Sequence, residues 1–74
     1  MEITELETYQ DKTVVLNLKD GEIATVKIVF VDAEHDDIIV DIIRTNRPKQ
    51  YKGPRDAAYT IHATDIAFLD EISN

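Results

Sequence analysis

The residues best suited to bind a charged ligand are gathered in one segment, RTNRPKQYKGPR, at positions 44–55. This segment holds five of the eight basic residues and none of the fifteen acidic ones, although the whole chain has a net charge of −7. Lysine and arginine attract phosphates, and an aromatic ring between them can stack on a nucleobase. The alternative is a polar hairpin loop whose charges only keep the protein soluble. The segment predicts contacts with single-stranded nucleic acid from Arg44, Arg47, Lys49, Tyr51, Lys52 and Arg55.

A second polar group, Glu34 to Asp37 with His35 inside it, could hold a divalent cation. It lacks the glycine and the terminal glutamate of a calcium-binding loop, so a solvated acidic turn is favoured and no metal site is predicted. Catalysis is not expected, because the only serine is Ser73, cysteine is absent and no glycine-rich phosphate loop is present. We therefore expect neither an enzyme nor a cofactor.

The composition indicates one small domain, residues 1–74. A chain of this length buries a limited core, and without cysteine it has neither a disulfide nor a zinc site to add stability. Self-association is the remaining way to add stability. The start of the chain is acidic and no long apolar run occurs, so we expect no membrane span and a soluble, cytoplasmic protein.

Hydrophobic periodicity predicts one short helix followed by five strands. Thr4 and Glu7 have the spacing of a helix capping box, and apolar residues recur nearby at helical intervals. Alternation then predicts a strand at 12–18, the turn Asp20-Gly21, and a long strand at 23–31 with Val26, Ile28 and Phe30 on one face. Three further strands are expected at 38–43, 57–63 and 66–69. This order is typical of an all-β fold, a small, strongly bent, SH3-like five-stranded barrel.

Two motifs in this order resemble those of the Sm-like family, which includes the LSm and Hfq proteins. In DGEIATVKIVFVD, Asp20-Gly21 and Asp32 have the spacing of the first Sm motif. In IHATDIAFL, the apolar residues Ile61, Ile66 and Leu69 match the second motif, with His62-Ala63 where Arg-Gly is usual. The chain departs from the family at Val26, which replaces a glycine, and at Asp36 or Asp37, where an asparagine usually contacts a base.

The resemblance implies a homo-oligomeric ring that binds single-stranded RNA, or DNA, without chemistry. In such rings the fourth strand of one subunit pairs with the fifth strand of the next, which here implies interface positions at Tyr59, Ile61, Ile66 and Phe68. The same resemblance implies an RNA pocket formed by His35, Asp37, His62 and Ala63. An aspartate cannot donate a hydrogen bond, so the uridine preference of relatives is not expected. The alternative function is an SH3-like protein-interaction module whose acidic surface meets a basic partner.

Overall fold

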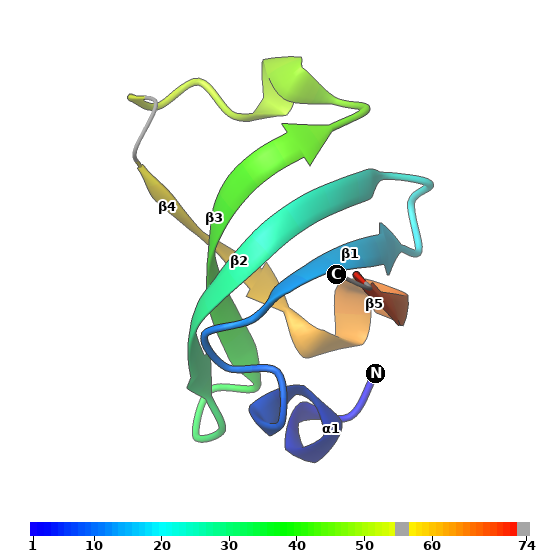
Figure 1. The fold of residues 1–74 in the computed structure, drawn as a ribbon, viewed down its shortest axis with the longest axis vertical. Helices are drawn as coiled ribbons and strands as arrows, with labels where there is room; N and C mark the ends of the chain where they lie inside the picture. Colours follow the sequence, from blue (N-terminus) through cyan, green and yellow to red (C-terminus); the bar gives the residue numbers. More distant parts are fainter. Residues whose placement is uncertain (55–56, 73–74) are drawn as a thin grey trace.

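The computed structural model describes residues 1–54 and 57–72. One short helix opens the chain and five antiparallel strands follow it, which confirms the predicted all-β class (Figure 1). Two single-turn 3-10 helices, η1 and η2, flank β4 along the chain. The elements are α1 (Ile3–Glu7), β1 (Thr13–Leu18), β2 (Ile23–Asp32), β3 (Asp37–Thr45), η1 (Pro48–Gln50), β4 (Ala58–His62), η2 (Ala63–Asp65) and β5 (Ile66–Glu71).

The five strands form one sheet in the order β4-β3-β2-β1-β5. Each hydrogen-bonded pair within it is antiparallel, and the Asp20-Gly21 turn joins β1 to β2 as predicted. Gly21 has a φ of +97°, a conformation that glycine adopts without strain. Within the described residues, β4 and β5 are the two edges of the sheet and do not pair with each other. Figure 1 shows that β2 and β3 curve along their length, so the sheet wraps around its own concave face.

The helix begins at Ile3, with Glu2 as its N-cap residue, and no side chain caps it. The predicted capping box from Thr4 to Glu7 is therefore wrong, because Thr4 lies inside the helix instead of at its N-cap position. Leu6 is fully buried and holds α1 against the core, while Ile3 and Tyr9 pack beside it. A five-residue helix has little stability alone, so tertiary packing maintains it.

The pairing between β2 and β3 has two irregularities. The register shifts between Thr25 and Val26 and again between Ile28 and Phe30. An extra residue at a bulge reverses the alternation, so Val31 is buried whereas Phe30 is 48% exposed. The prediction that Phe30 shares a face with Val26 and Ile28 is therefore wrong, since it assumed an unbroken period of two.

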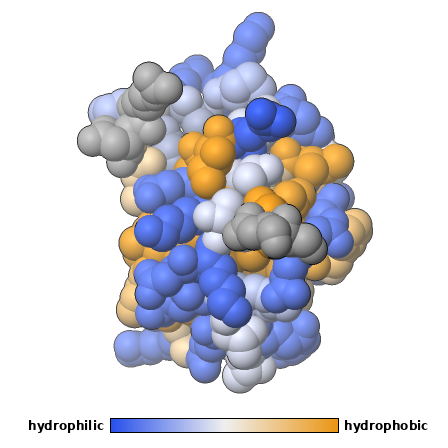
Figure 2. All heavy atoms as spheres, viewed as in Figure 1, coloured by the Kyte–Doolittle hydropathy of each residue, from blue (hydrophilic) through white to orange (hydrophobic). Residues whose placement is uncertain are grey.

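The core is formed by apolar side chains from α1, from every strand and from η2. These buried residues are Leu6, Val14, Leu16, Ala24, Val26, Ile28, Val31, Ile38, Val40, Ile61, Ala63 and Ile66. Figure 2 shows that the apolar groups left on one face of the surface form separate patches among hydrophilic residues. No helix in the described part of the chain is long and apolar enough to cross a membrane.

Candidate functional site

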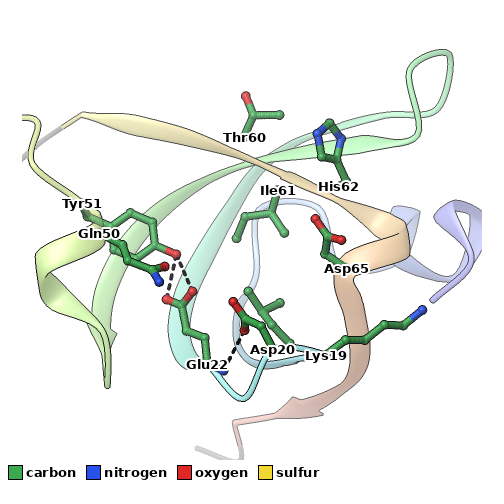
Figure 3. A pocket seen from close by; sticks show the side chains of 10 residues that line it. Lys19, Asp20, Glu22, Gln50, Tyr51, Thr60, Ile61, His62 and Asp65 are labelled. Carbon is green, nitrogen blue, oxygen red and sulfur yellow. Dashed lines mark hydrogen bonds between the residues drawn. The ribbon is translucent and has the colours of Figure 1, made fainter.

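The segment after β3 is held against the β1–β2 hairpin by a buried carboxylate, that of Glu22. This side chain is 1% exposed. The Thr45 hydroxyl donates to its Oε2 at 2.6 Å. The Tyr51 hydroxyl donates at 2.7 Å to Oε2 and 2.9 Å to Oε1 (Figure 3). Among the described residues, no lysine, arginine or histidine forms an ion pair with it. The two hydroxyls therefore supply the hydrogen bonds that a buried carboxylate requires.

Tyr51 is thus an anchor for the loop. Its ring meets the ring of Tyr59 edge to face, with centroids 4.9 Å apart and an interplanar angle of 77°. Burial raises the pKa of the Tyr51 hydroxyl above its ordinary value, and the hydrogen bond to Glu22 raises it further. The sequence predicts that the Tyr51 ring stacks on a base, and the structure shows that its hydroxyl is directed to Glu22.

Arg47 and Asn46 fasten the same loop to the hairpin turn. Arg47 donates to the backbone oxygen of Asp20 at 2.6 Å and forms an ion pair with the Asp20 carboxylate at 3.1 Å. The Asn46 side chain accepts from the backbone N–H of Ile23 and donates to the carbonyl of Gly21. Part of the predicted basic surface is consequently used to maintain the loop conformation.

Farther along the same loop, between η1 and β4, Gly53 contacts the side chain of Tyr59. The Gly53 N–H donates to the Tyr59 hydroxyl at 2.9 Å. A Cβ atom at Gly53 would lie 2.7 Å from that hydroxyl oxygen, so a larger residue there would displace the Tyr59 side chain. Together with the contacts of Arg47 and Tyr51, this contact gives the loop a defined shape before any ligand binds.

Three of the predicted phosphate-binding cations are exposed: Lys49 and Lys52 on this loop, and Arg44 in the strand before it. Lys49 lies in η1, and Arg44 lies near the end of β3. Arg55, which was also predicted as a contact, lies outside the described residues. Among the described residues, Arg47 is the predicted cation that is engaged in an ion pair within the fold.

The two histidines lie at the opposite end of β3, and each contacts an aspartate. His35 is in the β2–β3 turn, and its Nδ1 lies 2.8 Å from Oδ2 of Asp32. His62, at the end of β4, contacts Asp37 through its own Nδ1. Asp32 and Asp37 are register partners, and so are Asp37 and His62. The four side chains therefore come from adjacent positions at one end of the sheet, and we call them the Asp–His row.

Both imidazoles are open to solvent, with 66% of the His35 side chain and 64% of the His62 side chain exposed. The hydrogen bond from the His35 ring lowers the pKa of Asp32 below its ordinary value. The predicted pocket residue Ala63 is fully buried, and its N–H donates to the backbone oxygen of Asp36 at 2.9 Å. Its side chain belongs to the core, while its backbone joins η2 to the acidic turn.

The predicted binding residues thus form two groups. His35, Asp37, His62 and Ala63 are brought together at the start of β3, whereas Arg44, Arg47, Lys49, Tyr51 and Lys52 lie at or beyond its end. Asp37 and Arg44, the members of the two groups that lie in β3, are seven positions apart, which is roughly 23 Å along the strand at about 3.3 Å per residue. One protomer therefore has two polar ends that one short ligand segment would not span.

A pocket of about 530 Å³ lies along β4. Figure 3 shows Glu22 and Tyr51 on one side of it and Ile61 pointing inward from β4, with Thr60 and His62 on the other side of the strand. Its lining also includes Leu18, Lys19, Asp20, Gln50 and Asp65. The pocket follows the unpaired edge of the sheet from the basic loop toward η2.

The predicted interface residues have two different environments. Ile61 and Ile66 are core side chains, and Tyr59 is partly buried against the core, so contacts from Ile61 and Ile66 to another subunit would involve their backbone. Phe68 is 54% exposed on β5. Within residues 1–54 and 57–72, no group of histidine, cysteine, aspartate or glutamate side chains is arranged to hold a metal ion.

Comparisons with protein-family models, with curated proteins and with solved structures found no match. Function is therefore argued from the geometry of this chain. Sequence reasoning missed the Glu22 network, because nothing in the sequence distinguishes Glu22 from the other acidic residues.

Proposed function

We propose that this protein is an Sm-like subunit that assembles into a homo-oligomeric ring and binds single-stranded RNA. The observation that carries the proposal is the pair of unpaired edge strands, β4 and β5, at the two ends of one antiparallel sheet. Unpaired strand edges are templates for pairing with another chain. Pairing β4 of one copy with β5 of the next satisfies both edges and accounts for the exposure of Phe68.

The RNA contacts in this proposal come from both polar ends of the protomer. The exposed imidazoles of His35 and His62 stack on bases or hydrogen-bond their edges, as RNA-binding proteins commonly do. The exposed Arg44, Lys49 and Lys52 attract phosphates at the other end. A ring repeats each group in every subunit, so individually weak contacts act together.

The assembly is tested by light scattering on the parent protein and on two lysine variants. The parent is expected to have a single mass corresponding to roughly five to seven subunits, as a closed symmetric oligomer requires. Phe68→Lys is expected to dissociate it, because an edge-strand lysine opposes pairing. The control is Ile43→Lys, which alters a side chain with similar exposure, 59%, on the inner strand β3. A monomeric parent at micromolar concentration would rule out the ring.

RNA binding is tested by fluorescence anisotropy with labelled single-stranded RNA at low salt. Saturable binding that weakens as salt increases is expected, because phosphate contacts release counterions. Absence of binding at low salt would rule out this function and favour the second candidate.

The second candidate is a protein-interaction module with a basic partner. It is favoured by the acidic neighbours of both histidines and by the engagement of Arg47 and Tyr51 within the fold. With a net charge of −7, the protein attracts cationic surfaces over about 8–10 Å at physiological salt. Binding of a lysine- and arginine-rich peptide without any binding of RNA would distinguish this candidate.

A further inference from the structure

One side chain, that of Tyr59, contacts the residues on both sides of the exposed cation Lys52. The ring of Tyr51, which precedes Lys52, meets the Tyr59 ring edge to face with centroids 4.9 Å apart. Gly53, which follows Lys52, donates its backbone N–H to the Tyr59 hydroxyl at 2.9 Å. Because each residue has only two soft backbone dihedrals, a chain held on both sides of one residue has little freedom there. Tyr59 therefore fixes the backbone of Lys52 from both sides.

Tyr59 is itself held by the sheet. It lies in β4, where it is the register partner of Val40 in β3, and its side chain packs against the hydrophobic core. Tyr51 has a second anchor, because its hydroxyl donates to the buried Glu22 carboxylate. The short stretch that carries Lys52 is consequently attached to β4 on one side and to the β1–β2 hairpin on the other.

The contact between Gly53 and Tyr59 can be broken from either partner. Removing the Tyr59 hydroxyl takes away the acceptor of the Gly53 N–H. A Cβ atom added at Gly53 would lie 2.7 Å from the hydroxyl oxygen and 3.1 Å from the Cβ atom of Ala57. Gly53 does not have a positive φ, so an added methyl group acts through this crowding and not through backbone strain.

The side chain of Lys52 remains available to a ligand. Lys52 is exposed and forms no ion pair with any residue that the structure describes. A mobile loop loses backbone freedom when it binds, and this loss opposes binding. A loop that is already ordered avoids the loss, so the same cation contributes more to the affinity.

We propose that Tyr59 is a positioning residue for the phosphate contact of Lys52, to which it contributes by fixing the backbone at Tyr51 and Gly53. The inference rests on the proposed RNA-binding function and gives Tyr59 a second role. In the proposed ring its backbone pairs with the next subunit, while its side chain holds the basic loop.

The test is a double-mutant cycle, measured by fluorescence anisotropy with labelled single-stranded RNA at low salt. Tyr59→Phe keeps the ring and removes the hydroxyl that accepts from Gly53. It is expected to weaken binding about twofold to fivefold, the lower part of the range for residues that act through one another. In the Lys52→Gln background the same substitution is expected to have no further effect, because the contact that Tyr59 positions is already absent.

Lys49→Gln is the matched control. Lys49 is an exposed cation of the same loop, but it lies in η1, before the residues that contact Tyr59. Tyr59→Phe is expected to keep its full effect in the Lys49→Gln background. Gly53→Ala breaks the same contact from the other side, and its effect is likewise expected to disappear when Lys52 is replaced.

A measurement without RNA tests the cause. Nitrogen-15 relaxation of backbone amides reports motion on the picosecond to nanosecond timescale. Tyr59→Phe is expected to raise the mobility of the Lys52 and Gly53 amides and to leave that of Val40, on the adjacent strand, unchanged. Unchanged relaxation at Lys52 and Gly53 would overturn the positioning role, whatever RNA the protein binds.

The outcomes separate the two proposals. If Tyr59→Phe lowers the affinity equally with and without Lys52, its effect is purely structural, and the inference is overturned while RNA binding stands. Unchanged affinity of Tyr59→Phe overturns the inference too. Failure of the parent to bind RNA overturns both proposals. Light scattering and circular dichroism confirm that each variant keeps the mass and the fold of the parent.

Discussion

The Tyr51 hydroxyl and the Glu22 carboxylate, 29 positions apart in the sequence, are joined by contacts of 2.7 and 2.9 Å. This contact connects the loop after β3 to the first residue after the β1–β2 turn. It holds the part of the loop around Tyr51 against the hairpin. The exposed lysines of that loop are therefore presented from a fixed framework.

Replacing Tyr51 by phenylalanine is expected to destabilise the fold by about 1–3 kcal/mol, because the buried Glu22 carboxylate loses a donor. For a domain of this size, each kcal/mol lowers Tm by roughly 4–8 °C. Thermal unfolding followed by circular dichroism measures the change. Tyr9→Phe is the control, since the Tyr9 hydroxyl makes no side-chain hydrogen bond within the described residues, and equal melting temperatures for the two variants would contradict the prediction.

Stability should also fall at alkaline pH because of the same hydroxyl. Burial and the Glu22 hydrogen bond raise the pKa of Tyr51 in the folded state, whereas in the unfolded chain it has its ordinary value of about 10. The raised pKa stabilises the fold fully below pH 10, and this contribution is lost as the pH increases above 10. Urea unfolding at pH 9 and at pH 11 should reveal the loss in the parent, and Tyr51→Phe should lose less stability over the same interval.

The contact between His35 and Asp32 should stabilise the fold less at acidic pH. The histidine hydrogen bond lowers the pKa of Asp32 below its ordinary value of 3.8. This contribution to stability is present above that value and is lost as the pH falls through the lower folded-state pKa. In His35→Ala, the NMR titration of the Asp32 carboxyl carbon should move upward toward 3.8. An unchanged titration would mean that the contact with His35 does not persist in solution.

The bulge in β2 predicts a large loss of stability for a substitution at one residue and a small one at its neighbour. Val31→Ala removes buried methyl groups and should cost about 1.5–3 kcal/mol, whereas Phe30→Ser changes an exposed side chain and should stay within about 0.5 kcal/mol. Urea denaturation gives both values. The reverse order would mean that the strand keeps its unbroken alternation.

The exposed lysines of the loop should contribute to RNA binding without contributing to folding. Replacing Lys49 and Lys52 by glutamine should flatten the log–log dependence of affinity on salt by about 0.7 for each lost phosphate contact. The melting temperature should not change, because neither side chain forms an ion pair within the described residues. The matched control replaces Lys12 and Lys27, which lie away from the loop, and an identical slope in both double variants would contradict the prediction.

The strands could be predicted because a half-buried strand repeats apolar residues with a period of two. Val14 and Leu16 follow that rule, and so do Ala24, Val26 and Ile28. The change at Phe30, where the buried and exposed faces of β2 exchange, could not be predicted. A bulge adds one residue to a strand, and without a glycine no residue in the sequence marks its position. The pattern therefore gave the position of β2 but not the residue at which its faces exchange.

The candidate site was predictable in its residue types and less so in its arrangement. The exposed lysines and the pair of histidines stand out in composition, whereas the roles of Arg47 and Tyr51 depend on partners more than 25 positions away. A basic or aromatic residue in a loop looks the same in sequence whether it faces solvent or a buried carboxylate. The separation of the two groups by the length of β3 also follows only from the sheet register.

The bulges in the β2–β3 pair also have a consequence for the proposed assembly through the two sheet edges. Because β4 and β5 are different surfaces, pairing one with the other is a head-to-tail contact that repeats the same rotation at every added copy. If that rotation divides a full turn evenly, the series closes and no edge is left. If it does not, the series continues as an open filament. The bulges at Thr25/Val26 and Ile28/Phe30 bend the sheet between these edges, so in the proposed ring we expect a change in strand curvature, even far from either edge, to favour fibres over a closed assembly.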